Sequence, residues 1–285
     1  MIKLIYGDCL EILPTLEKNS FDMTFNDLPY GTTACSWDSI IPFDKMWDAL
    51  NPVMKERAAK IFTGTEPFSS HLRLSNLKEF KYDWVWHKNL TGGFALSKIQ
   101  PFISQENCSV FYFKQSTYNF IKELRDTKPQ SKERIKYKYK DKGNLNNIYK
   151  NFKSYKKEGY ICDELRYPTT IKKFDCVNPV KRIHPTQKPV TLISYMIKTY
   201  TNEGETIIDI TCGSCSTGIA AQETNRNAIL IEKSPLWYNV AVRRNQGEDH
   251  KSLKAYIKEM RERYGPKKAD FEAPLQFPKE MVIKI

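Results

Sequence analysis

Short, almost continuously apolar runs alternate with segments of helical spacing over residues 1–114. Such runs are typical of strands that are covered on both faces, as in the parallel sheets of α/β proteins. The segments between them place apolar residues three and four positions apart, which favours helices. The pattern predicts strands at Ile2–Tyr6, Phe21–Asn26, Ala59–Gly64, Trp84–His87 and Cys108–Phe113, and helices at Ile40–Asn51 and Pro67–Leu77.

Residues 183–246 show the same alternation and predict a βαβ unit between flanking helices. Together with residues 1–114, this unit predicts one α/β domain of Rossmann-like type, with a mostly parallel, twisted sheet and helices on both faces. The expected order is helix Thr191–Thr201, strand Thr206–Ile210, helix Thr217–Thr224, strand Ala228–Glu232 and helix Pro235–Asn245.

The remaining two segments are different in character. Residues 247–285 contain one amphipathic helix and a proline-rich end, which we expect to pack on the body of the protein or on a second subunit. The apolar stripe of this tail helix is Leu253, Tyr256, Ile257, Met260 and Tyr264.

Residues 115–182 form a basic segment. They carry 18 Lys and Arg against 8 Asp and Glu, within a chain of net charge +12.

Two interpretations of the basic segment 115–182 remain open. Lys and Arg release counterions from phosphates, and the seven tyrosines among them offer faces on which bases stack, so the segment fits an inserted module that reads DNA. The alternative is a low-complexity linker whose charges are only solvated. We favour the recognition module.

Composition excludes several classes of protein. Of the 285 residues, 40% are hydrophobic and 27% charged, so disordered, collagen-like and coiled-coil chains fit poorly. No apolar stretch approaches the roughly 20 residues that span a bilayer, and Asp8 interrupts the start before a signal-type run forms. The seven scattered cysteines are an odd number, which fits reduced thiols. We expect a soluble cytoplasmic protein.

The tetrapeptide Asp27-Leu-Pro-Tyr30 follows the predicted strand Phe21–Asn26 directly. At the end of a strand, a carboxylate, free backbone carbonyls and an aromatic face can together hold a planar ligand by its exocyclic amino group. Taken alone, the tetrapeptide is also compatible with an ordinary turn.

A loop of small residues, Asp209 to Gly218, joins a predicted strand to a predicted helix. Doubly wound folds bind nucleotides at this position. Glu232 ends the next strand, at about the 20-residue spacing typical of an acid that binds ribose hydroxyls. The loop also contains Cys212 and Cys215. A redox pair or a zinc site there lacks the accompanying thioredoxin-like layout or second Cys pair, so we predict no metal.

The order of three motifs resembles a known family. Asp27-Leu-Pro-Tyr30, His184-Pro-Thr-Gln-Lys-Pro189 and the Asp209–Gly218 loop are similar to the motifs of S-adenosylmethionine (SAM)-dependent amino-group DNA methyltransferases. The arrangement is the circularly permuted one, with the catalytic motif before the cofactor loop, and it is nearest to phage and restriction-modification enzymes that methylate adenine at N6. The resemblance covers residues 1–114 and 183–246, including Gly7-Asp8-Cys9-Leu10 and the Trp84–Lys88 stretch.

The resemblance implies roles for individual residues. An adenine would be rotated out of the duplex, with Asp27 accepting one N6–H, a backbone carbonyl near Leu28 or Pro29 accepting the other, and Tyr30 stacking on the base. The family pattern places Thr186 and Lys188 near the methionine end of SAM. The full set of implied cofactor residues is Asp8, Cys9, Thr186, Lys188, Asp209, Thr211, Cys212, Gly213, Ser214 and Glu232.

Three positions depart from the family pattern. Cys215 stands where a small residue, usually glycine, is normal, and a Cβ in left-handed geometry costs roughly 1–2 kcal/mol. We expect the Cys215 thiol to crowd the cofactor. Thr211 replaces the usual aromatic of the loop, and Leu28 replaces a proline that contributes mainly its backbone.

The sequence therefore predicts an enzyme that methylates adenine N6 in double-stranded DNA with SAM. Asp27, where cytosine-N4 enzymes have serine, favours adenine. Two alternatives remain, a cytosine-N4 methyltransferase and a catalytically silent DNA-binding relative or partner subunit. The sequence leaves open a homodimer and a partner restriction enzyme, and it fits the cytoplasm of a bacterial host or of a virus-infected cell.

Overall fold

The computed structural model describes residues 1–285 except 34, 36–37, 94–96, 125–164 and 284–285. Most of the basic segment 115–182 thus lies outside the described residues. The chain divides into two compact units, one formed by Met1–Asn119 with Thr170–Ile285 and the other by Phe120–Thr169.

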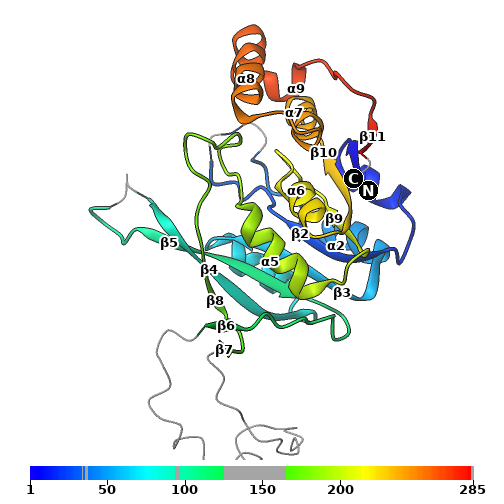
Figure 1. The fold of residues 1–285 in the computed structure, drawn as a ribbon, viewed down its shortest axis with the longest axis vertical. Helices are drawn as coiled ribbons and strands as arrows, with labels where there is room; N and C mark the ends of the chain where they lie inside the picture. The colour runs from blue at the N-terminus through cyan, green and yellow to red at the C-terminus, as the bar shows by residue number, and fades with distance from the viewer. Residues whose placement is uncertain (34, 36–37, 94–96, 125–164, 284–285) are drawn as a thin grey trace, which may run out of the picture. The chain divides into compact units, whose positions relative to one another are not determined.

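The larger unit contains a nine-stranded sheet in the order β11-β1-β10-β9-β2-β3-β5-β4-β8 (Figure 1). The five strands from β1 to β3 in this order are parallel, and β4 and β8 form a further parallel pair. The strands are β1 (Ile2–Tyr6), β2 (Phe21–Asn26), β3 (Met54–Gly64), β4 (Phe80–Gly92), β5 (Ile103–Phe111), β8 (Ile171–Phe174), β9 (Thr206–Asp209), β10 (Asn227–Glu232) and β11 (Glu280–Ile283).

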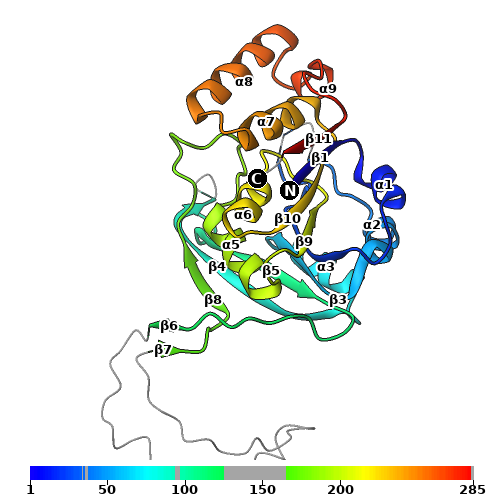
Figure 2. The same cartoon turned by 45° about the vertical axis from the view of Figure 1, so that its right-hand side comes forward.

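Helices cover both faces of this sheet (Figures 1 and 2). They are α1 (Cys9–Ile12), α2 (Phe43–Leu50), α3 (Phe68–Ser75), α5 (Val190–Tyr200), α6 (Ser216–Glu223), α7 (Pro235–Asn245), α8 (His250–Tyr264) and α9 (Ala269–Glu272), with short 3-10 turns at Leu13–Thr15 and Asn51–Val53. The α/β fold with a mostly parallel sheet is the one that the apolar pattern predicts, and it is confirmed.

Successive side chains of the central strands point to opposite faces of the sheet and pack in two different cores. In β9, Ile207 packs in the core that α5, α6 and α7 cover, whereas Ile208 packs in the core beneath α1, α2 and α3. Leu230 and Ile231 of β10 divide in the same way. Because both faces of the central strands are covered, these strands are continuously apolar in sequence.

The tail packs on the body of the protein. The buried side of α8, which includes Leu253, Tyr256 and Met260, forms a third core with α7 and α9. Strand β11 then pairs antiparallel with β1, which brings the two ends of the chain together (Figure 1). The apolar stripe of the predicted tail helix is thus buried against the same chain.

Several elements were not predicted from the pattern. The edge strands β8 and β11 and the short helices α1 and α9 are each only four residues long, which is too short to show a period. The β4–β5 hairpin is longer than expected, with strands of 13 and 9 residues, and it is antiparallel.

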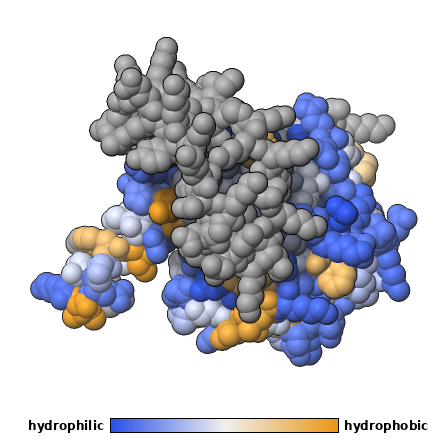
Figure 3. Space-filling view, turned by 90° about the horizontal axis from the view of Figure 1, so that it is seen from below, coloured by the Kyte–Doolittle hydropathy of each residue, from blue (hydrophilic) through white to orange (hydrophobic). Residues whose placement is uncertain are grey.

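Of the smaller unit, residues 120–124 and 165–169 are described, and there β6 (Glu123–Leu124) pairs antiparallel with β7 (Leu165–Arg166). Arg166 Nε donates to Glu123 Oε1 at 3.0 Å, and the rings of Phe120 and Tyr167 lie 4.9 Å apart. On the face of the molecule seen in Figure 3, hydrophilic residues predominate outside the grey atoms, and hydrophobic residues form small separate patches. Among the described residues, no helix combines the length and the apolar composition needed to cross a membrane.

Candidate functional site

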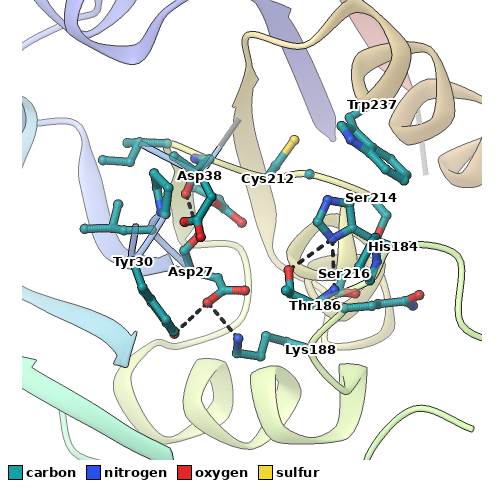
Figure 4. A pocket seen from close by; sticks show the side chains of 18 of the residues that line it. Asp27, Tyr30, Asp38, His184, Thr186, Lys188, Cys212, Ser214, Ser216 and Trp237 are labelled. Atoms are coloured by element: carbon teal, nitrogen blue, oxygen red, sulfur yellow. Dashed lines mark hydrogen bonds and ion pairs between the residues drawn. The ribbon is translucent and has the colours of Figure 1, made fainter. Parts of the chain in front are cut away.

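Four adjacent parallel strands, β1, β10, β9 and β2, end at one edge of the sheet. Asp8 and Asp27 follow β1 and β2, while Asp209 and Glu232 are the last residues of β9 and β10. All four side chains line one cavity of about 670 Å³, a size typical of small-molecule sites. Figure 4 shows the centre of this cavity.

Every site residue implied by the resemblance lines this cavity. The structure thus brings together the tetrapeptide Asp27–Tyr30, the His184–Lys188 stretch and the loop after β9, which lie far apart in the sequence. The lining includes Asp8, Cys9, Asp27, Leu28, Pro29, Tyr30, Thr186, Lys188, Asp209, Thr211, Cys212, Gly213, Ser214 and Glu232.

The carboxylate of Asp27 is held through one oxygen. Oδ1 accepts hydrogen bonds from Tyr30 Oη at 2.8 Å, Thr63 Oγ1 at 2.7 Å and Lys188 Nζ at 2.7 Å. Among the described residues, no donor lies on Oδ2. Figure 4 shows the carboxylate between Tyr30 and Lys188. One oxygen of Asp27 is therefore fixed, and the other is left to accept a hydrogen bond from a ligand.

Tyr30 is a donor within this cluster. Burial, together with the charges of Asp27 and Glu106, raises the pKa of Tyr30 well above its usual value, so the hydroxyl keeps its proton. Its ring packs against Phe68, with centroids 4.6 Å apart, and the Lys188 ammonium lies 5.6 Å from the ring centroid.

Lys188 joins two carboxylates. Its ammonium group lies 2.7 Å from Asp27 Oδ1 and 2.9 Å from Glu106 Oε1. Burial alone would lower the pKa of Lys188, but the two carboxylates outweigh it and raise the pKa above its usual value. The family resemblance implies that Lys188 lies near the cofactor, whereas in the structure its ammonium group contacts Asp27 and Glu106.

Glu106 is a site residue that sequence reasoning missed. It lies in β5, where Oε2 contacts Lys88 Nζ at 2.6 Å. Burial alone would raise the pKa of Glu106, but Lys188 and Lys88 outweigh it and lower the pKa to about 2. No motif marks this position. The available signal is one acid two residues before Cys108 and four before Val110, on the apolar side of a strand.

Asp209 connects the loop after β9 to the helix that follows. Its Oδ1 accepts from the backbone N–H of Thr211 at 3.0 Å, and its Oδ2 accepts from Thr217 Oγ1 at 2.6 Å. Thr211 Oγ1 in turn donates to the backbone carbonyl of Asp27 at 3.1 Å. Burial raises the pKa of Asp209 to about 7.

Glu232 holds the same loop from the end of β10. Its two oxygens accept from the backbone N–H groups of Gly213 and Ser234, both at 2.8 Å. Gly213 has φ +52°, which glycine adopts without strain. Burial raises the pKa of Glu232 to about 6. Within the described part of the chain, neither Glu232 nor Asp209 has an ion-pair partner.

Cys215 has the backbone strain that the sequence predicts but not the predicted contact. Its φ of +66° lies in the left-handed region. The thiol is fully buried and points under α6, where a Cβ added to Gly218 would come within 2.5 Å of it. Cys215 is not among the residues that line the cavity, which is evidence against a thiol that crowds the cofactor.

Cys212 lines the cavity but has no sign of redox reactivity. A hydrogen bond with Cys215 and burial raise the pKa of the Cys212 thiol well above its usual value. Reactive thiols have lowered pKa values. In the described ranges, no cluster of three His, Cys, Asp or Glu side chains could hold a metal ion.

His184 and Trp237 form the wall opposite Asp27 (Figure 4). Their rings meet edge to face, with centroids 4.2 Å apart, and His184 Nδ1 lies 3.1 Å from Thr186 Oγ1. Burial, with the nearby charges of Lys188 and Arg261, lowers the pKa of His184 to about 3, so its ring is neutral. The role of Trp237 in the wall was also missed, because it is one apolar residue in a buried helix.

Solved methyltransferases share this fold. The crystal structure of the M1.HpyAVI–SAM complex has a TM-score of 0.55 and 20% identity, covering 86% of this chain and all of that one. The PvuII DNA methyltransferase, which is cytosine-N4-specific, has a TM-score of 0.58 and 14% identity, with 89% and 90% covered. These similarities define the class as the methyltransferase fold.

Sequence comparisons identify the family. The Type II methyltransferase M1.MboII of Moraxella bovis is 26% identical over 84% of this chain and 94% of its own length. The DNA adenine methyltransferase YhdJ of Escherichia coli K12 is 24% identical over 92% and 88%. The family model of the N6 and N4 methyltransferases, described as DNA methylase, matches residues 21–243. The chain belongs to this family of SAM-dependent DNA methyltransferases, as its motifs predicted.

Proposed function

We propose that this enzyme transfers a methyl group from SAM to N6 of an adenine rotated out of double-stranded DNA. The observation that carries the proposal is a single cavity that contains both the Oδ2 atom of Asp27, with no donor among the described residues, and the loop held by Asp209 and Glu232. The names of the relatives M1.MboII and YhdJ are consistent with it.

The residues of the cavity fit SAM. SAM has a positively charged sulfonium and an ammonium group, and Asp209 and Glu232 are buried carboxylates that lack an ion-pair partner among the described residues. Glu232 ends β10, where acids bind ribose hydroxyls in doubly wound folds. We place Asp8, Cys9, Thr186 and the loop from Thr211 to Ser214 around the cofactor. When bound, SAM supplies the methyl group as an electrophile.

Asp27 and its neighbours position the amine. Oδ2 of Asp27 accepts one N6–H, and the backbone carbonyl of Leu28 or Pro29 accepts the second. Because both hydrogens are held, the nitrogen lone pair is directed away from the ring and toward the methyl group. Tyr30 contacts the base. The three donors on Oδ1 keep the carboxylate from rotating.

The basic segment 115–182 is proposed as the part that recognises the DNA target. Its residues 125–164, which include Lys136, Lys138 and Lys140, lie outside the described residues. Reversing these three charges should weaken DNA binding and flatten its dependence on salt concentration. An unchanged salt slope in a filter-binding titration would assign the charges to a solvated linker. A homodimer and a partner restriction enzyme also remain proposals.

The direct test is transfer of tritium from labelled SAM to unmethylated, AT-rich bacterial DNA, followed by chromatography of the nucleosides. The proposal expects label in N6-methyladenine. Label in N4-methylcytosine would keep the enzyme class but correct the base. If DNA receives no label although the protein binds both SAM and DNA, the chain is a silent relative or an incomplete partner.

A further inference from the structure

Glu106 is an acid on an otherwise apolar side of β5. Cys108 and Val110, two and four residues further on, are fully buried on that side, and Glu106 itself is 4% exposed. A buried carboxylate is costly unless it is paired, and a buried ion pair is often no more stabilising than apolar residues of the same volume. Stability alone does not explain a glutamate at this position.

Glu106 shares two donors with Asp27. Lys188 lies 2.9 Å from Glu106 and 2.7 Å from Asp27, and Tyr30 Oη lies 2.9 Å and 2.8 Å from the same two carboxylates. Lys188 has three N–H groups and can serve both acids at once. Tyr30 has one hydroxyl proton, so it donates to only one of the two carboxylates at a time.

We propose that Glu106 is a positioning residue for the methyl-transfer reaction, which fixes Lys188 and Tyr30 and takes part of the positive charge of Lys188 away from Asp27. This inference rests on the proposed function. Without Glu106, the ammonium and the phenolic proton would act on Asp27 alone, and its free oxygen would become a weaker acceptor for the amine of the target base. Glu106 thus acts through its neighbours Lys188 and Tyr30.

Glu106 lies among charged groups of both signs, so variants that remove a negative and a positive charge can be compared. Lys88 from β4 and Lys188 from the stretch before α5 face it as cations, while Asp27 and Tyr30 face it from the loop after β2. Lys88 contacts Glu106 Oε2 at 2.6 Å, and no contact joins it to Asp27 among the described residues. Removing Glu106 takes away a negative charge near Asp27, whereas removing Lys88 takes away a positive charge. The two changes should therefore shift the pH dependence of kcat in opposite directions.

The experiment compares Glu106→Gln, which keeps size and one acceptor oxygen, with Lys88→Met and Glu106→Asp. For Glu106→Gln we expect kcat on DNA to fall about 10- to 100-fold, the effect of a disturbed hydrogen bond to a charged group, with nearly unchanged SAM affinity. The acid limb of the kcat–pH profile should move to lower pH, because a neighbouring negative charge is lost. In Lys88→Met it should move to higher pH. Glu106→Asp should recover part of kcat.

Glu79→Gln is the matched control. Glu79 and Lys60 form another buried ion pair at 2.5 Å, and neither residue lines the cavity. This variant should lower the Tm and leave kcat and the acid limb unchanged.

Two results would overturn the role of Glu106. One is a Glu106→Gln variant that loses Tm like the control but keeps kcat and its pH profile. The other is an acid limb that moves in the same direction in Glu106→Gln and Lys88→Met. A wild-type protein that methylates no DNA would instead overturn the proposed function itself.

Discussion

The ammonium group of Lys188 lies 2.7 Å from Oδ1 of Asp27, although 161 residues separate the two in the chain. Thr211 makes a second link of this kind through its hydrogen bond to the Asp27 carbonyl. Residues from the segment after the basic segment 115–182 therefore hold the Asp27–Tyr30 tetrapeptide directly. Asp27, Lys188 and the loop after β9 are parts of one hydrogen-bond network.

Lys188→Met distinguishes the two roles considered for this lysine. Its contacts with Asp27 and Glu106 predict a loss of kcat of about 10- to 100-fold with nearly unchanged SAM affinity. The Tm should also fall, because the buried carboxylate of Glu106 and the partly buried carboxylate of Asp27 lose their shared cation. Calorimetry with SAM is the measurement. A large loss of SAM affinity with unchanged kcat would place Lys188 on the cofactor instead.

The raised pKa of Asp209 makes the stability of the ligand-free protein depend on pH. Burial raises the pKa of Asp209 to about 7 from 3.8, so the folded protein holds this proton more tightly than the unfolded chain does. Stability from Asp209 is therefore present at low pH and is lost as the pH rises through about 7. The Tm of the wild type relative to Asp209→Asn should fall between about pH 4 and about pH 7 and change little at higher pH.

The same titration should appear in cofactor binding. A cationic ligand favours the ionised carboxylate, so SAM affinity of the wild type should increase over this pH range, and the increase should be smaller in Asp209→Asn. Thermal shift with and without SAM measures both effects. A constant Tm difference between the two proteins across this range would show that Asp209 ionises at its ordinary pKa.

Cys215→Gly tests the strained position at the start of α6. Glycine relieves the strain of the left-handed φ, which costs a cysteine roughly 1–2 kcal/mol. The variant also loses the packing of a fully buried thiol. Because the two effects oppose each other, the unfolding free energy should change by less than about 1 kcal/mol. SAM affinity should stay the same, because the thiol points away from the cavity. A tenfold gain in affinity, seen by calorimetry, would mean that the thiol does crowd the cofactor.

The central fold could be predicted because burial on both faces leaves a clear pattern. Each of the runs Ile2–Tyr6 and Phe21–Asn26 coincides with a strand of the sheet. The edge strands β8 and β11 could not be predicted, because each is only four residues long and so shows no period.

The site, like the fold, has residues that the sequence predicts and residues that it does not. Asp27, Asp209 and Glu232 follow or end strands and belong to local motifs, so their convergence follows from a parallel sheet. Glu106 belongs to no motif, and its partners Lys188 and Tyr30 lie 82 and 76 residues away in the sequence. Only the tertiary fold brings these groups together.

The central claim is that Asp27 binds the target amine in a cavity whose other residues bind SAM. Asp27→Asn keeps the shape of the side chain but removes its charge, and Asp27→Ala removes the acceptor. The measurement is methyl transfer to DNA and SAM affinity in the same preparations. The account predicts that both variants bind SAM nearly as the wild type does and transfer no methyl group. Substantial methyl transfer by Asp27→Ala would contradict it.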